Sequence, residues 1–194
     1  MSFIKNMRKG LKGYLEQDTV RLRYYYIKRF LSTRGIYLPL PYLINFSREM
    51  WMGQGIKDQH PNPETYIKAD GSTAALFSEV LPYLKKEDRI LEIGCNVGRS
   101  LKYLHDLGFR NLSGIEIGVK AVELMQKTFP QVYRDSKIMV GDAVKIIKEL
   151  KTDEYDLVFC HSVLVSIHPK FNEVFSQIAR VSRKFVLILE NEGS

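Results

Sequence analysis

Three carboxylates and two glycines have the types and the spacing that could hold a nucleoside. They are Glu92, Gly94, Gly98, Glu116 and Asp142. A carboxylate can accept hydrogen bonds from both hydroxyls of a ribose, and glycines in a tight turn let a ligand approach the backbone closely. Glu116 lies 22 residues after Gly94, at the end of the next apolar run. The pattern therefore indicates a nucleoside site.

The elements that must position these residues alternate between strand and helix. We expect strands at 89–93, 112–117, 138–140, 155–160 and 185–189, with amphipathic helices between them, one over about 171–180. Before the first strand, a helix capped by Ser72 should run through Leu81 and end near Pro82, and the helix after the second strand should end before Pro130. Such alternation predicts an α/β fold, a doubly wound and mostly parallel sheet with helices on both faces. The carboxyl ends of parallel strands meet at one edge, so the three carboxylates should lie together there.

The glycine turn reads EIGCNVG over residues 92–98 and resembles the first motif of class I S-adenosylmethionine-dependent methyltransferases. Asn96 replaces the middle glycine of that motif, and asparagine adopts left-handed backbone more readily than most residues. A dinucleotide fingerprint would require glycines where Asn96 and Arg99 stand, so a dinucleotide site is poorly matched. A tight strand–helix turn without any ligand is the structural alternative.

The resemblance implies a Rossmann-like core that binds S-adenosyl-L-methionine. The cofactor-binding residues that it implies are Glu92, Gly94, Cys95, Asn96, Gly98, Glu116, Ile117, Asp142 and Ala143. In the family, the residue at Glu116 binds the ribose, Ile117 packs on the adenine, Asp142 accepts from the adenine amino group and Ala143 offers its N–H. Glu92 would organise the glycine turn from beneath.

Each carboxylate also has a structural interpretation. Glu116 could be an ordinary loop acid, Asp142 is a good helix N-cap, and Glu92 could pair with a basic neighbour. The functional interpretation depends on their joint occurrence after three successive strands.

The segment FCHSVLVSIH, residues 159–168, resembles the part of the family that lines the sulfonium and the acceptor. His161 and His168 are therefore the candidate catalytic residues, for orientation or as a base, although both could be structural histidines. The signatures of base-amino and cytosine-C5 methylating enzymes are absent, so elimination favours a small-molecule or carbohydrate hydroxyl. The four histidines show no metal-ligand spacing, and no metal site is expected.

The amino-terminal part is strongly basic. The formal net charge of the chain is +7, and residues 1–37, with nine basic and two acidic side chains, carry all of it. We expect residues 1–71 to form a basic helical arm and a lid segment, and residues 72–194 to form the methyltransferase core. The lid would include Trp51, Gln54, His60 and Tyr66.

The arm could pack its aromatic side chains on the core, which we favour, or bind an anionic membrane surface; nucleic acid is a less favoured partner. An RNA or protein acceptor recruited by the arm, and a non-catalytic cofactor-binding or membrane-associated module, are the alternatives to an enzyme acting on a small molecule or glycan.

Composition narrows the class of protein. Apolar residues make up 45% of the chain, which is typical of a globular protein rather than a disordered one. The absence of a long apolar run or signal core, and the presence of only two cysteines, predict a cytoplasmic protein, with peripheral membrane association as an alternative. The sequence ends directly after the fifth expected strand, which predicts either a truncated core or a reduced sheet. The far edge of such a sheet would be exposed or covered by a partner, as in a homo-oligomer.

Overall fold

The computed structural model describes residues 51–52, 63–68, 72–164, 167 and 173–190, all of which belong to one compact unit running from position 41 to position 194. Most of the expected arm, along with Gln54, His60 and His168, lies outside the described residues. The predicted division between residues 1–71 and 72–194 therefore stays a prediction.

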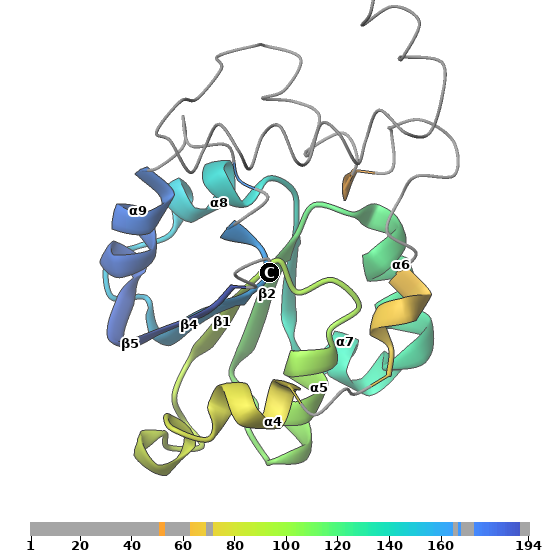
Figure 1. Ribbon diagram of the computed structural model, residues 1–194, viewed down its shortest axis with the longest axis horizontal. Helices are drawn as coiled ribbons and strands as arrows, with labels where there is room; N and C mark the ends of the chain where they lie inside the picture. The colour runs from red at the N-terminus through yellow and green to blue at the C-terminus, as the bar shows by residue number, and fades with distance from the viewer. Residues whose placement is uncertain (1–50, 53–62, 69–71, 165–166, 168–172, 191–194) are drawn as a thin grey trace, which may run out of the picture. The chain divides into compact units, whose positions relative to one another are not determined.

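A single five-stranded parallel sheet forms the centre of the unit (Figure 1). Its strands are β1 (Ile90–Ile93), β2 (Leu112–Glu116), β3 (Lys137–Val140), β4 (Tyr155–His161) and β5 (Ser182–Leu189), in the spatial order β3-β2-β1-β4-β5. Every neighbouring pair is parallel. The predicted doubly wound α/β fold is confirmed, and the order reverses beside β1, where such sheets bind ligands at the carboxyl ends of their strands.

Helices cover both faces of the sheet. The helices are α4 (Ser72–Phe77), α5 (Arg99–Asp106), α6 (Val119–Thr128), α7 (Pro130–Asp135), α8 (Ala143–Glu149) and α9 (Glu173–Val181). Side chains of α4 to α7 pack in one apolar cluster with Ile90 and Phe159, whereas α8 and α9 pack in a second cluster with Leu91 and Val158. Successive strand residues thus point into opposite clusters, as the period of two requires.

The helix boundaries differ from expectation in two places. The helix expected to run through Leu81 ends at Phe77, because the following N–H groups of Ser78 and Val80 bond three residues back instead of four. The helix expected to end before Pro130 does end at Thr128, but Pro130 then begins the short helix α7 as its first residue.

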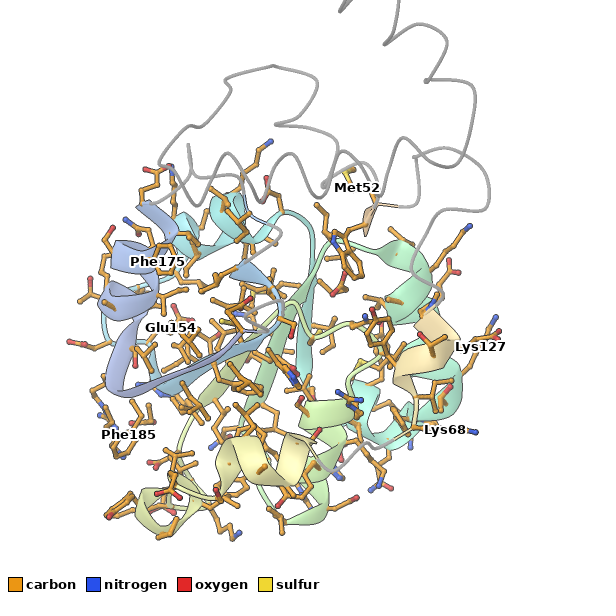
Figure 2. The ribbon with its side chains drawn as sticks, in the orientation of Figure 1. Met52, Lys68, Lys127, Glu154, Phe175 and Phe185 are labelled. Atoms are coloured by element: carbon orange, nitrogen blue, oxygen red, sulfur yellow. The ribbon has the colours of Figure 1, made fainter. Side chains whose placement is uncertain are left out.

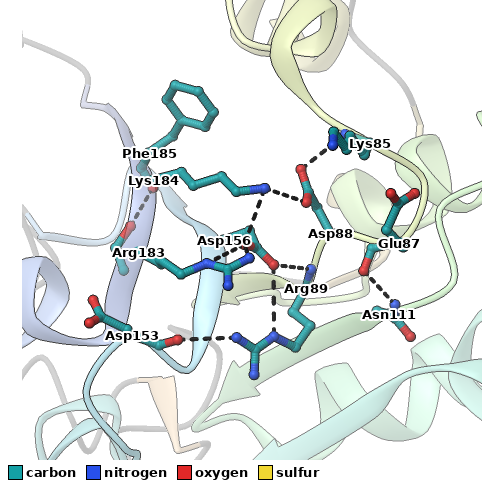
Figure 3. Close-up of polar contacts among 11 residues, drawn as sticks. Lys85, Glu87, Asp88, Arg89, Asn111, Asp153, Asp156, Arg183, Lys184 and Phe185 are labelled. Carbon is teal, nitrogen blue, oxygen red and sulfur yellow. Dashed lines mark hydrogen bonds and ion pairs between the residues drawn. The ribbon is translucent and has the colours of Figure 1, made fainter.

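The amino ends of β1, β4 and β5 are joined by a cluster of charges, which we call the amino-end cluster: Asp88, Arg89, Asp156, Arg183 and Lys184 (Figure 3). Asp156 Oδ2 accepts from the Arg89 backbone N–H at 2.9 Å, and its Oδ1 accepts from Arg183 Nε at 2.8 Å. Lys184 Nζ lies 2.6 Å from Asp88 Oδ1 and 3.3 Å from Asp156 Oδ1. These contacts fix the start of the edge strand β5 to the centre of the sheet.

Beyond the edge strand β5, no further strand is paired with it among the described residues. Val186 and Ile188 on β5 are exposed, and so is Phe175 on α9, which is labelled in Figure 2. Within the described ranges, no helix is long and apolar enough to cross a membrane. The expected homo-oligomer stays a prediction.

Candidate functional site

The glycine turn between β1 and α5 has the left-handed backbone that its sequence indicates. The φ angles are +72° at Gly94, +48° at Asn96 and +76° at Gly98. The N–H groups of Gly94 and Cys95 both donate to the carbonyl of Ile115, at 2.8 and 3.0 Å, which anchors the turn on β2. Asparagine at position 96 therefore supplies the conformation for which the motif ordinarily uses glycine.

The two glycines of this turn serve close packing as well as backbone freedom. A Cβ on Gly94 would lie 2.4 Å from Val163 Cγ2, and one on Gly98 would lie 2.6 Å from Met125 Cε. The absence of a side chain at Gly94 thus lets the loop after β4 pack closely against the turn, and its absence at Gly98 does the same for α6. Gly98 does not line the cavity described below.

Glu116 at the end of β2 connects two turns. Its Oε2 accepts from the Asn96 N–H and its Oε1 from the Gly118 N–H, both at 2.7 Å. Glu116 is buried, and burial raises its pKa, although the backbone hydrogen bonds oppose the rise. It is therefore a buried organiser of the glycine turn, and not the loop acid of the structural alternative.

Glu92 lies beneath the turn on β1. Its side chain is buried and its Oε2 has no hydrogen-bond partner. Burial raises its pKa well above the ordinary value, the charge of Glu116 adds to the rise, and a hydrogen bond from Ser100 and the charge of Arg99 oppose it. A buried carboxyl oxygen without a partner is costly to the fold and is available to a ligand or a bound water.

Asp142 and Ala143 follow β3. Asp142 caps α8, because its Oδ1 accepts from the Val144 N–H at 3.0 Å. The structural interpretation of Asp142 is therefore confirmed, and the residue also lines the cavity. A capping carboxylate at the carboxyl end of a strand can serve both purposes, since each oxygen accepts more than one hydrogen bond.

One cavity of about 420 Å³ brings the predicted residues together at the carboxyl ends of the strands. Eight of the nine predicted cofactor residues line it: Glu92, Gly94, Cys95, Asn96, Glu116, Ile117, Asp142 and Ala143. His161, at the end of β4, also lines it, as do Trp51 and Tyr66 of the expected lid. The volume lies in the range of small-molecule sites, which is roughly 300–1,000 Å³.

Two features of the loop after β4 had no signal in the sequence. Ser162 has a φ of +56°, which is unusual for a residue other than glycine, and its buried Oγ has no hydrogen-bond partner. Glu190, beyond the end of β5, accepts hydrogen bonds from this loop. Only the pairing of β4 with β5 in space brings Glu190 to this loop.

The cavity fits S-adenosyl-L-methionine in the chemistry of its groups. A nucleoside carrying an amino acid presents hydroxyls and an ammonium, which need acceptors, and an adenine, which needs an apolar wall. The cavity offers the carboxyl groups of Glu92, Glu116 and Asp142, an unpartnered Asn96 Oδ1, and the apolar Ile117. Among the described residues, no group of three or more His, Cys, Asp or Glu could hold a metal ion.

The sequence matches the model of a protein family described as "Methyltransferase domain" over residues 91–188, which is just over half of the chain. The match begins in β1 and ends in β5, and so includes at least most of each strand of the sheet. No curated protein is significantly similar to the chain in sequence.

Several solved structures share the fold, and two of the following three are named as methyltransferases. Phosphoethanolamine N-methyltransferase 1 of Haemonchus contortus superposes with a TM-score of 0.61 at 16% identity, over 81% of this chain and 35% of that one. The PH0226 protein of Pyrococcus horikoshii gives 0.55 at 24% identity, over 69% and 66%. A SAM-dependent methyltransferase of Archaeoglobus fulgidus gives 0.51 at 20% identity, over 63% and 53%. The chain thus spans less than two thirds of the length of each of these proteins.

Proposed function

The chain belongs to the methyltransferase domain family, of the class I type that uses S-adenosyl-L-methionine as cofactor, and from this premise we propose that it methylates a hydroxyl of a small-molecule or carbohydrate acceptor. The observation that carries the proposal is one cavity whose wall runs from Glu116 and Asp142 to His161. The same cavity therefore holds the side chains that would bind a nucleoside and a histidine that could orient an acceptor.

In this proposal, three residues hold the nucleoside. Glu116 accepts the ribose hydroxyls, because each carboxylate oxygen can accept more than one hydrogen bond and so can serve a ligand as well as the backbone. Asp142 accepts from the adenine amino group while it caps α8, and Ile117 packs on the ring. Glu92 supports the glycine turn from beneath and offers its unpartnered Oε2 to the cofactor.

The acceptor side of the cavity is lined by His161, Ser162 and Val163 from the end of β4, together with the aromatic residues Trp51 and Tyr66. The bound cofactor supplies an activated methyl group on a sulfonium, so the protein has mainly to align the acceptor oxygen and exclude water. His161 orients the hydroxyl and takes its proton as the oxygen–carbon bond forms. The aromatic side chains give the acceptor a face against which to stack.

A transfer assay with S-adenosyl-L-methionine labelled in its methyl group tests this proposal. Panels of sugars and phenols, of amines, of RNA and of proteins would be compared, with His161→Ala and the remote His105→Ala as matched variants. His105 contacts Asp135 at 2.8 Å in a separate pair between α5 and α7. We expect alkali-stable label on a hydroxyl compound and a loss of rate in the His161 variant alone; label on amines only would contradict the proposal.

A second candidate has an RNA acceptor, since residues 1–37 hold all of the excess positive charge. Binding through phosphates weakens steeply with salt, so RNA binding that falls between about 50 and 200 mM salt and needs residues 1–37 would favour this candidate. Label appearing on RNA in the same assay would then replace the small-molecule proposal. Cofactor binding without transfer to any panel would instead indicate a non-catalytic module.

A further inference from the structure

The loop after β4 holds a conformation that its own residues do not prefer. Ser162 has a φ of +56°, in the left-handed region that a residue with a Cβ seldom occupies. Such backbone persists only where surrounding structure holds it, and it gathers at functional sites. Ser162 and Val163 both line the cavity, so whatever holds this loop also shapes the cavity wall.

The carboxyl end of β5 holds the loop through three successive N–H groups. Ser162 donates to the carbonyl of Leu189 at 2.7 Å. Val163 and Leu164 then donate to one carboxylate oxygen, Glu190 Oε1, at 3.0 and 2.9 Å. Hydrogen bonds from backbone N–H to a carboxylate are stronger than those to a neutral acceptor, so Glu190 is the principal support of the two residues that follow Ser162.

The neighbouring thiol adds to this arrangement. Cys160 Sγ lies 3.8 Å from the same Oε1 of Glu190. Burial, the Glu190 charge and this hydrogen bond raise the pKa of Cys160 to about 12, so the thiol stays protonated and can donate. Three donors thus converge on one carboxylate oxygen beside the cavity.

The loop in turn contacts the glycine turn. Val163 fills the space in front of Gly94, where a Cβ would come within 2.4 Å of Val163 Cγ2. Valine is stiff at its first side-chain torsion, so a displaced backbone at position 163 would carry its methyl groups with it. A displacement of Glu190 would therefore move Val163, and Val163 would in turn change its contact with Gly94.

We propose that Glu190 is a positioning residue, which sets the loop at 162–164 and, through Val163, the shape of the cofactor-binding turn at Gly94. It acts on the cofactor only through this loop. The inference rests on the proposed function in one respect, namely that the cavity binds S-adenosyl-L-methionine. Its effect on the loop itself does not depend on what the cavity binds.

The first test is hydrogen exchange of the loop amides, measured on the full chain. We expect the amides of Val163 and Leu164 to exchange at least about tenfold faster in Glu190→Ala than in the wild type, because their acceptor is gone. Glu190→Gln should protect them nearly as well, since its amide oxygen still accepts. Glu154→Ala is the matched control: Glu154 accepts one N–H, from Lys151 at 2.7 Å, at the opposite end of β4. Unchanged exchange in a folded Glu190→Ala would overturn the proposal.

The second test is titration with S-adenosylhomocysteine. Glu190→Ala should bind roughly tenfold more weakly, because a smaller fraction of molecules has the competent loop, whereas Glu190→Gln and Glu154→Ala should stay within about twofold of the wild type. If Glu190→Ala does not fold, Glu190→Asp, whose carboxylate is one methylene too short to keep both bonds, replaces it. Failure of the wild type to bind would overturn the proposed function, whereas equal binding by wild type and variant would overturn this inference alone.

A double-mutant cycle separates positioning from a general loss of stability. If Glu190 acts through Val163, the effects of Glu190→Ala and Val163→Ala on the affinity for S-adenosylhomocysteine should not add, and the double variant should bind about as well as the weaker single one. Additive effects would mean that Glu190 acts by another route, and would overturn the transmission through Val163.

Discussion

The two ends of the sheet each bury two carboxyl groups, but the two pairs differ in their partners: cationic side chains form ion pairs with those at the amino end. Asp88 and Asp156 at the amino ends are 3% and 2% exposed, and Glu92 and Glu116 at the carboxyl ends are 4% and 5% exposed. Asp156 has Arg183 and Lys184 as partners. Glu116 has backbone N–H groups, and Glu92 has an oxygen without any partner.

The consequence is visible in the direction of the pKa shifts. Burial raises the pKa of Asp156, but hydrogen bonds from the Arg89 N–H, Arg183 and Lys184 outweigh it and hold that pKa below its ordinary value. Burial of Glu92 and Glu116 is not offset in this way, and their pKa values are raised. Asp156 lies closer to the protein surface than Glu92 and Glu116, so both its shallower position and its partners contribute to the difference. The amino end stabilises the fold, and the carboxyl end leaves acceptors for a ligand.

The largest effect should come from removing the central carboxylate of the amino-end cluster. Asp156→Ala leaves the Arg89 N–H without its acceptor and removes the side-chain contacts that join the start of β5 to that of β1, so we expect a loss of about 2–3 kcal/mol in the free energy of unfolding. Urea denaturation measures it. Asp106→Ala, which removes an exposed ion pair with Lys102, is the control and should cost less than about 0.5 kcal/mol.

The contribution of Asp156 should depend on pH. Because its pKa is lower in the folded state, the difference in stability between wild type and Asp156→Ala should be fully present above the ordinary aspartate pKa, about 3.9, and should shrink as the pH falls through the folded value. If the stability difference between wild type and Asp156→Ala instead grew as the pH fell, Arg183 and Lys184 would not be stabilising the charged form of Asp156.

Gly94→Ala should have the next largest effect, on affinity at the carboxyl end. The new methyl group would meet Val163 at 2.4 Å in a backbone with a φ of +72°, so the turn must move. We expect S-adenosylhomocysteine binding to weaken roughly 100-fold, as a displacement near 1 Å at a site can cause. Gly108→Ala is the matched control, because Gly108 has a φ of +91° but its nearest neighbour, Lys86 Cδ, is 3.9 Å away. Equal losses of affinity in both variants would show that general destabilisation, and not the contact with Val163, is responsible.

Glu92→Gln should have the smallest effect and the opposite sign on stability. The raised pKa means that ionisation of Glu92 costs folding free energy, so the wild type loses stability as the pH rises from the ordinary glutamate pKa toward the folded value. Glutamine avoids this cost, and we expect about 0.5–2 kcal/mol of added stability at neutral pH, diminishing toward pH 4. The exposed Glu149→Gln should show no such trend in thermal melts. A destabilised Glu92→Gln at neutral pH would contradict the account.

The sequence predicted the end of the sheet where the site lies, because strand periodicity and the carboxylates after the strands are both local signals. It did not predict what Glu116 does in the fold, since its contact with the Asn96 N–H depends on the turn that Asn96 makes. Glu190 was missed for a related reason: its partners lie 26 and 27 residues away, and only the pairing of β4 with β5 joins them. The sequence also did not predict that α4 ends at Phe77, because the helical spacing of apolar residues continues past Phe77 into a turn.

The central claim is that the carboxyl end binds S-adenosyl-L-methionine while the amino end serves the fold. Calorimetric titration with S-adenosylhomocysteine of the wild type, Glu116→Ala and Asp156→Ala tests it most directly, under conditions in which all three are folded. We predict binding by the wild type, binding weakened about tenfold or more by Glu116→Ala through the lost ribose contacts, and unchanged affinity in Asp156→Ala. Absence of binding by the folded wild type, or equal losses in both variants, would contradict the division between the two ends.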